Sequence, residues 1–268
     1  MTSTPGVLAG FEREPFDALG ATRDVWWAGT GPAVLVISEL PGITPEVAGF
    51  ARKVLAHGMT VAMPHLFGED GRAPTGGYVL RSLARACVSR EFTVMATGRS
   101  SPVVAWLRAL ARHAHERCGG PGVGVVGMCF TGGFALAMMA DAPVVAPVLS
   151  QPSLPFSLGT RRAADVGCSA AELTAVKEKV AGGAQVLGLR FTNDPAVKPA
   201  RFETLRRELG DGFLAVELDS SPGNPYGHRT GAHSVLTEDL VDRAGSPTLA
   251  ALGQVLGFLA AKLGVLPA

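Results

Sequence analysis

The fold is decided by the stretch Gly122-Val-Gly-Val-Val-Gly-Met-Cys129-Phe-Thr-Gly-Gly-Phe-Ala-Leu-Ala-Met-Met-Ala140, which predicts a strand, a sharp turn and a helix. A nucleophile elbow needs small residues on both sides of the nucleophile, because its backbone is strained and the helix packs closely against the strand. Gly127 lies two residues before Cys129, and Gly132 and Gly133 follow it. The stretch therefore predicts that Cys129 lies at the tip of such an elbow.

A cysteine is a chemically suitable nucleophile at this position. The N-terminus of a helix offers free N–H groups and the positive end of the helix dipole, and both favour the thiolate, which is the reactive form of cysteine. The alternative is that Cys129 is a small buried hydrophobic residue in a glycine-rich turn, which is a common environment for cysteine. The residues that follow the elbow favour the first interpretation.

An acidic residue and a histidine follow the elbow in the order that an α/β-hydrolase uses. Asp194 lies just past the predicted strand 185–191, and a loop after the predicted strand 213–218 contains His233. Asp211 precedes its strand, and Asp219 lies only 14 residues before His233, so both fit the acidic position less well than Asp194. His228, in the same loop, competes with His233 for the position of the base.

On both sides of the elbow, short apolar runs alternate with longer stretches of helical periodicity. The predicted strands are 33–37, 60–63, 122–126, 144–149, 185–191 and 213–218, and the predicted helices are 46–57, 101–118, 130–141, 169–181 and 200–209, with a terminal helix on the leucine stripe 249–263. This alternation predicts an α/β protein with a mostly parallel central sheet and helices on both faces.

No linker divides the chain, so residues 1–268 are predicted to form a single domain. Two stretches, 68–100 and 151–164, interrupt the alternation of strands and helices. Loops of this length often serve as lids or pocket walls, and surface decoration is the alternative. We expect a candidate cap or lid segment within residues 68–100.

The composition excludes several classes of partner. Lys and Arg number 24 against 23 Asp and Glu, and no basic run exceeds two residues, so nothing predicts binding to nucleic acid or to an anionic membrane. Residues 1–24 lack the basic start and apolar block of a signal peptide, and no apolar stretch reaches the roughly 18 residues of a membrane span. We expect a soluble, cytoplasmic protein whose four cysteines are reduced thiols.

The chain resembles the dienelactone hydrolase family of α/β-hydrolases. The elbow Gly127-Met-Cys129-Phe-Thr-Gly-Gly133 resembles that family's Gly-x-Cys-x-Gly-Gly signature, and Asn193-Asp194-Pro195 resembles its acid loop. Ala232-His233-Ser234 is similar to its histidine loop, and Ser38-Glu39-Leu40 with the following Pro-Gly is similar to its Glu-containing loop. The resemblance covers nearly the whole chain and implies an α/β-hydrolase fold.

The resemblance implies a role for each matched residue. Cys129 would be the nucleophile, His233 its base and later the general acid, and Asp194 the residue that orients the imidazole. The match falls on His233 rather than His228, and His233 also lies where its loop re-enters the core. We therefore prefer His233 as the base and expect His228 to be a pocket or surface residue.

Three further positions follow from the same resemblance. Backbone N–H groups of Leu40 and Phe130 would form the oxyanion hole. Glu39 would contact the thiol in the resting enzyme, and the alternative for it is an exposed loop carboxylate. Thr131 departs from the family pattern, which has glycine there, so either the elbow is reshaped or Thr131 Oγ1 enters the substrate pocket. Together with His228, Thr131 is a candidate pocket residue.

These residues predict a hydrolase that cleaves an ester, lactone or thioester through a Cys129 acyl-enzyme, acting on a small-molecule acyl substrate. The arginines that bind a substrate carboxylate in the family cannot be located, so the dienelactone substrate itself is not implied. We expect no cofactor and no metal, and a monomer or homodimer. The alternative function is a non-catalytic or redox-sensing protein of this fold that retains a reactive Cys129.

Overall fold

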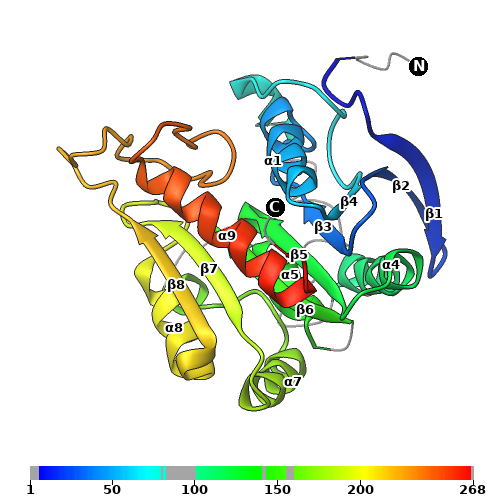
Figure 1. The fold of residues 1–268 in the computed structure, drawn as a ribbon. Coiled ribbons are helices and arrows are strands. Elements are labelled where there is room, and N and C mark those ends of the chain that lie inside the picture. Colours follow the sequence, from blue (N-terminus) through cyan, green and yellow to red (C-terminus); the bar gives the residue numbers. More distant parts are fainter. Residues whose placement is uncertain (1–5, 80, 83–100, 141–142, 155–159, 267–268) are drawn as a thin grey trace.

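The computed structural model describes residues 6–79, 81–82, 101–140, 143–154 and 160–266. Its centre is an eight-stranded sheet in the order β1-β2-β4-β3-β5-β6-β7-β8 (Figure 1). The strands are β1 (Glu12–Ala18), β2 (Ala21–Ala28), β3 (Ala33–Ile37), β4 (Thr60–Pro64), β5 (Val123–Met128), β6 (Val144–Ser150), β7 (Val186–Phe191) and β8 (Phe213–Leu218). Strands β3 to β8 pair in parallel, and β1 and β2 add an antiparallel edge. The predicted α/β-hydrolase fold, with its mostly parallel sheet, is confirmed.

The central strands are continuous apolar runs because helices cover both of their faces. Every residue of β3, β4, β5 and β7 is buried. Val and Ile dominate β3, and their branched side chains fit a pleated surface that is covered on both sides. Because these strands are parallel, their carboxyl ends meet at one edge of the sheet, where a site can form.

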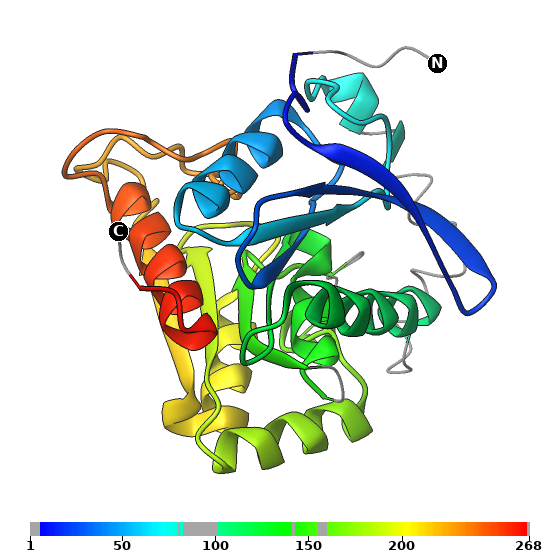
Figure 2. The same ribbon diagram turned by 45° about the vertical axis from the view of Figure 1, so that its right-hand side comes forward.

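The helices form two layers, one on each face of the sheet (Figures 1 and 2). Helices α1 and α9 pack on one face, and α4, α5, α7 and α8 pack on the other. Their bounds are α1 (Pro45–Ala56), α4 (Pro102–Cys118), α5 (Gly132–Met138), α6 (Thr160–Ala163), α7 (Ala170–Ala181), α8 (Pro199–Leu209) and α9 (Pro247–Leu263). Helices on both faces of the sheet were expected from the sequence, and the structure has them.

The hairpin of β1 and β2 was not predicted. Its first strand is mostly exposed, so the alternation of apolar and polar residues that marks a half-buried strand is weak there. The turn between the strands uses Leu19 and Gly20, both with positive φ, and a leucine in that conformation is a poor sequence signal. The hairpin extends the sheet beside β4, and β4 and β3 separate it from β5 (Figure 1).

The predicted cap segment, within residues 68–100, lies partly outside the described residues. Of this segment, the structure describes only residues 68–79, 81 and 82. Its described part runs beside the loop after β3: a Cβ at Gly68 would lie 2.1 Å from the carbonyl oxygen of Pro41. The cap therefore stays a prediction. Among the helices that the structure describes, none has the length and apolar character needed to cross a membrane.

Candidate active site

The elbow at the end of β5 has strained backbone. Cys129 has φ +55°, a conformation that costs a non-glycine residue free energy and is common at functional sites. A short 3-10 turn, Cys129–Thr131, then leads into α5. The strain lifts the Cys129 side chain out of the sheet at the carboxyl edge of its central strand.

The glycines of the elbow permit the close packing that the sequence predicted. A Cβ at position 127 would lie 2.2 Å from the carbonyl oxygen of Thr131, far inside a van der Waals contact. At Gly132 it would lie 2.7 Å from Pro152, and at Gly133 it would lie 2.8 Å from the carbonyl oxygen of Gly167. Each glycine therefore allows the turn or the first residues of α5 to approach a different neighbour.

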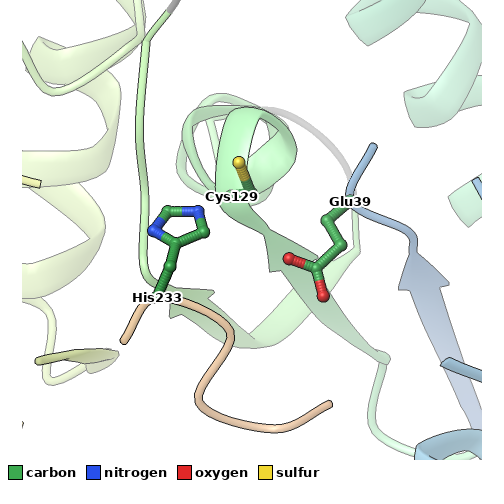
Figure 3. Close-up of side chains that lie close together, drawn as sticks. All are labelled: Glu39, Cys129 and His233. Atoms are coloured by element: carbon green, nitrogen blue, oxygen red, sulfur yellow. The ribbon is translucent and has the colours of Figure 1, made fainter. Parts of the chain in front are cut away.

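His233 lies between Asp194 and Cys129. Its Nδ1 is 2.6 Å from Oδ2 of Asp194, a buried carboxylate whose other oxygen accepts a hydrogen bond from the Ala196 N–H at 2.8 Å. The Asp194 contact uses Nδ1, so Nε2 is the ring nitrogen left for the hydrogen bond with Cys129. Figure 3 shows the imidazole beside the sulfur at the tip of the turn. Cys129, His233 and Asp194 therefore lie in a row, with the histidine in the middle.

The electrostatics of this row favour a charged imidazole. Burial by itself would lower the pKa of His233, but the negative charge of the Cys129 thiolate and the hydrogen bonds with Asp194 and Cys129 outweigh it. Together they raise the pKa of His233 well above its ordinary value. By contrast, burial raises the pKa of the Cys168 thiol to about 12, with the nearby carboxylates of Glu172 and Asp165 contributing, so this cysteine stays protonated and unreactive.

Glu39 is buried in the loop after β3 and is held by three donors. Its Oε2 accepts hydrogen bonds from Ser234 Oγ at 2.7 Å and from Gln151 Nε2 at 3.2 Å, and its Oε1 accepts one from Thr237 Oγ1. It is therefore not an exposed loop carboxylate. A carboxylate oxygen of Glu39, the Cys129 sulfur and a ring nitrogen of His233 all lie within 4.8 Å of one another (Figure 3).

The role expected for Glu39, contact with the resting thiol, remains a prediction. The structure brings its carboxylate near the sulfur, but the hydrogen bonds recorded for its two oxygens go to Gln151, Ser234 and Thr237. Thiolate, imidazole and carboxylate are also ligand types for zinc, and this trio is the one such group that converges within the described part of the chain. The same thiol and imidazole also belong to the row that ends at Asp194.

A cavity of about 270 Å³ opens beside the thiol. Among the residues that line it are Leu40, Pro74, Cys129 and His233. Leu40, one predicted oxyanion residue, thus lies at the cavity wall, and Phe130, the other, directly follows Cys129 in the 3-10 turn. A larger cavity, of about 370 Å³, is lined by Gly31, Thr60 and Arg117 near the start of β3, away from Cys129.

The structure places both candidate pocket residues away from this cavity. Thr131 is fully buried, and its Oγ1 donates to the carbonyl oxygen of Ile37 at 2.9 Å and accepts from the Met128 N–H at 2.8 Å. These hydrogen bonds connect the elbow to β3 and satisfy the Thr131 hydroxyl inside the fold. His228 is buried with its ring against Phe191, with 5.2 Å between the ring centroids. Neither side chain lines the cavity beside Cys129.

Asp239 is a residue of the site that the sequence analysis did not identify. Its Oδ2 accepts hydrogen bonds from the backbone N–H groups of His233, at 2.8 Å, and Ser234, at 3.1 Å. Its Oδ1 accepts two hydrogen bonds from Arg229, at 2.7 and 3.0 Å. Asp239 thereby fixes the backbone that carries His233. No spacing signal marks it, because its contact with the His233 segment is made to main-chain N–H groups.

The fold and this site define an α/β-hydrolase with a cysteine at the elbow. A sequence model of the dienelactone hydrolase family matches residues 16–228, so the chain belongs to the dienelactone hydrolase family and is a hydrolase. The match includes Glu39, Cys129 and Asp194 and ends before His233. A search of curated proteins finds no match to this chain.

Solved structures share the fold at low sequence identity. A candidate dienelactone hydrolase from Klebsiella pneumoniae is similar, with a TM-score of 0.63 at 16% identity over 93% of this chain and 98% of that one. A dienelactone hydrolase-like promiscuous phosphotriesterase from metagenomic libraries has a TM-score of 0.57 at 17% identity over 93% and 98% of the two chains. The thioesterase domain from the curacin biosynthetic pathway has 0.52 at 12% identity over 92% and 99%.

Proposed function

We propose that this hydrolase cleaves a carboxylic ester, lactone or thioester through an acyl-enzyme on Cys129, with His233 and Asp194 completing a triad. The observation that carries the proposal is the position of His233, hydrogen-bonded through Nδ1 to the buried Asp194 and through its other side to a cysteine held at positive φ. A nucleophile, a base and an orienting acid in hydrogen-bond contact are the parts that acyl transfer needs.

In the acylation step, the Cys129 thiolate attacks the carbonyl carbon of the substrate and forms the S–C bond. The carbonyl oxygen becomes an oxyanion, for which the N–H groups of Leu40 and Phe130 are the proposed donors. When the tetrahedral intermediate collapses, the bond to the leaving alcohol or thiol breaks, and the imidazolium of His233 gives that group its Nε2 proton. A thioester of the acyl group with Cys129 remains.

In the deacylation step, neutral His233 removes a proton from water, and the resulting hydroxide equivalent attacks the thioester carbon. The intermediate collapses with loss of the Cys129 thiolate, the acid product leaves, and the thiolate–imidazolium pair is restored. Asp194 keeps the imidazole oriented and stabilises its positive charge in both steps. A thioester is reactive enough toward water for this cycle to turn over, whereas an unactivated amide is a poorer substrate for acylation.

The lining of the cavity favours an uncharged acyl group. Four carboxylates lie in its wall, namely Glu39, Glu46, Glu238 and Asp239. Among the described residues of the wall, the one arginine is Arg229, which is already paired with Asp239 at 2.7 Å. A substrate carboxylate would meet a wall of like charge, so we propose neutral esters, lactones or thioesters as the substrate class.

The proposal is tested by trapping the acyl group. Wild-type protein mixed with p-nitrophenyl acetate and quenched in acid is expected to gain one acetyl group on Cys129, measured by intact mass and peptide mapping, and to release p-nitrophenol with turnover. Cys129→Ala is expected to show neither. If the wild type hydrolyses no member of a panel of p-nitrophenyl esters, small lactones and thioesters, the proposal fails. A readily oxidised Cys129 would then favour the redox-sensing alternative.

The pH dependence of hydrolysis follows from the raised pKa of His233. The imidazolium is the proposed acid for the leaving group, so kcat/KM is expected to persist well above pH 6.5, the ordinary pKa of histidine, and to fall as pH rises through the higher value. The same interactions stabilise the fold below the unfolded-state pKa, and that contribution is lost as pH rises through the folded-state pKa. A pH–rate profile checks this, and an alkaline limb at or below 6.5 would contradict it.

A further inference from the structure

Ser153 places a hydroxyl against the sulfur of Cys129. It lies three residues after the end of β6, and its Oγ is 3.1 Å from Cys129 Sγ. The side chain is 7% exposed, so this hydroxyl is largely withdrawn from water. The sulfur therefore has a second polar neighbour in addition to the imidazole of His233.

The backbone around Ser153 is fixed by contacts that the hydroxyl does not make. The Ser153 N–H donates to the carbonyl oxygen of Cys129 at 2.9 Å, which ties the loop to the elbow. The buried guanidinium of Arg201 donates to the carbonyl oxygen of Pro152 at 2.5 Å. Pro152 in turn packs against Gly132, where an added Cβ would lie 2.7 Å from its ring. The position of the hydroxyl is therefore set by three neighbouring elements.

We propose that Ser153 is a further catalytic residue of the Cys129 site, whose hydroxyl donates a hydrogen bond to the thiolate and so stabilises the nucleophile before substrate binds. This inference rests on the proposed acyl-transfer function of the same site. The hydroxyl keeps its proton throughout. It donates a hydrogen bond to the thiolate in the free enzyme, and this hydrogen bond breaks when the sulfur is acylated. A hydrogen bond to a charged group is stronger than one between neutral groups, which is why a serine suits this position.

Several charged groups also face the sulfur. The contribution of Ser153 to stabilising the thiolate can therefore be separated from theirs only by a substitution that changes the hydroxyl alone. His233 approaches from its loop, Glu39 from the loop after β3, and the buried Arg201 and Asp194 lie behind the site. Ser153→Ala removes one oxygen and leaves all four charges in place. Ser153→Thr keeps the hydroxyl.

The test is the rate at which iodoacetamide alkylates Cys129 as a function of pH, followed by peptide mass spectrometry so that the other cysteines do not contribute. In Ser153→Ala, the midpoint of the pH profile is expected to move up by about one pH unit, which lowers the alkylation rate about tenfold at pH values below both midpoints. Ser153→Thr is expected to stay close to wild type. Ser221→Ala, which removes an exposed serine from the loop after β8, is the matched control.

Two results would overturn the inference. One is a Ser153→Ala profile that superimposes on that of the wild type. The other is a rate that falls equally at every pH with an unchanged midpoint, which is the result expected if Ser153 only supports the local structure. Alkylation requires no substrate, so a shifted midpoint in a protein that hydrolyses no ester would contradict the proposed function while the thiolate contact stands.

Discussion

Replacing His233 by alanine is expected to lower kcat/KM for a p-nitrophenyl ester by about a thousandfold or more. In the proposed mechanism, removal of the imidazole takes away the ion-pair partner of the thiolate, the proton donor to the leaving group and the base that activates water. Asp194, which is buried, also loses the hydrogen bond at 2.6 Å that His233 provides. The measurement is steady-state hydrolysis with blanks for spontaneous cleavage, alongside circular dichroism to verify folding.

His228→Ala is the matched control for His233, because the two histidines lie five residues apart in the same loop. His228 packs on Phe191 and lies outside the cavity beside Cys129, so its removal is expected to change kcat/KM less than tenfold while lowering stability modestly through lost packing. A loss of activity confined to His228→Ala would reverse the assignment of the base.

Gly127→Ala is expected to destabilise the protein by about 3 kcal/mol. The added methyl group would lie 2.2 Å from the backbone oxygen of Thr131, and backbone cannot rotate away as a side chain can. Relief of the clash requires the elbow to move from the end of β5, which also displaces Cys129. The free energy of unfolding in urea measures the stability loss, and ester hydrolysis measures the displacement.

Gly253→Ala provides the matched control for the glycine substitution. Gly253 lies on the exposed side of α9, and a Cβ there would meet nothing within 4 Å. Alanine is a better helix former than glycine, so the free energy of unfolding of this variant is expected to rise by about 0.5 to 1 kcal/mol. An unfolding free energy for Gly127→Ala equal to that of wild type would show that the elbow tolerates a side chain and would contradict the packing argument.

The parallel part of the fold could be predicted because its signal is local. The buried strands are mainly apolar runs, and Pro32, Gly122 and Pro143 directly precede β3, β5 and β6. A capping box of Ser169 and Glu172 begins α7, within the helix predicted over 169–181. The hairpin of β1 and β2 lacked such a signal because one of its strands is largely exposed. Its pairing with β4 is a tertiary event that the local sequence does not encode.

The candidate site divides in the same way. Cys129, Asp194 and His233 could be proposed together because the sequence itself shows the spacing of the elbow and the order of the three residues. The structure brings the three side chains together. Ser153 and Asp239 could not, because each acts through a neighbour that is far away in sequence or through main-chain groups. Thr131 departs from the family's glycine, so it was expected either to reshape the elbow or to place its Oγ1 in the pocket. In the structure its hydroxyl forms hydrogen bonds with backbone groups inside the fold.

The buried carboxylate of Glu39 has a consequence for synthesis of the protein on the ribosome. Two of its three hydrogen-bond partners, Ser234 and Thr237, lie 195 and 198 residues further along the chain. Until they emerge, the carboxylate lacks two of the donors that offset its burial, and the loop that carries Leu40 has no anchor to the loop of His233. A nascent chain that already contains the Cys129 elbow therefore lacks His233 and two of the three donors to Glu39, and these groups can come together only after the ribosome has passed Thr237.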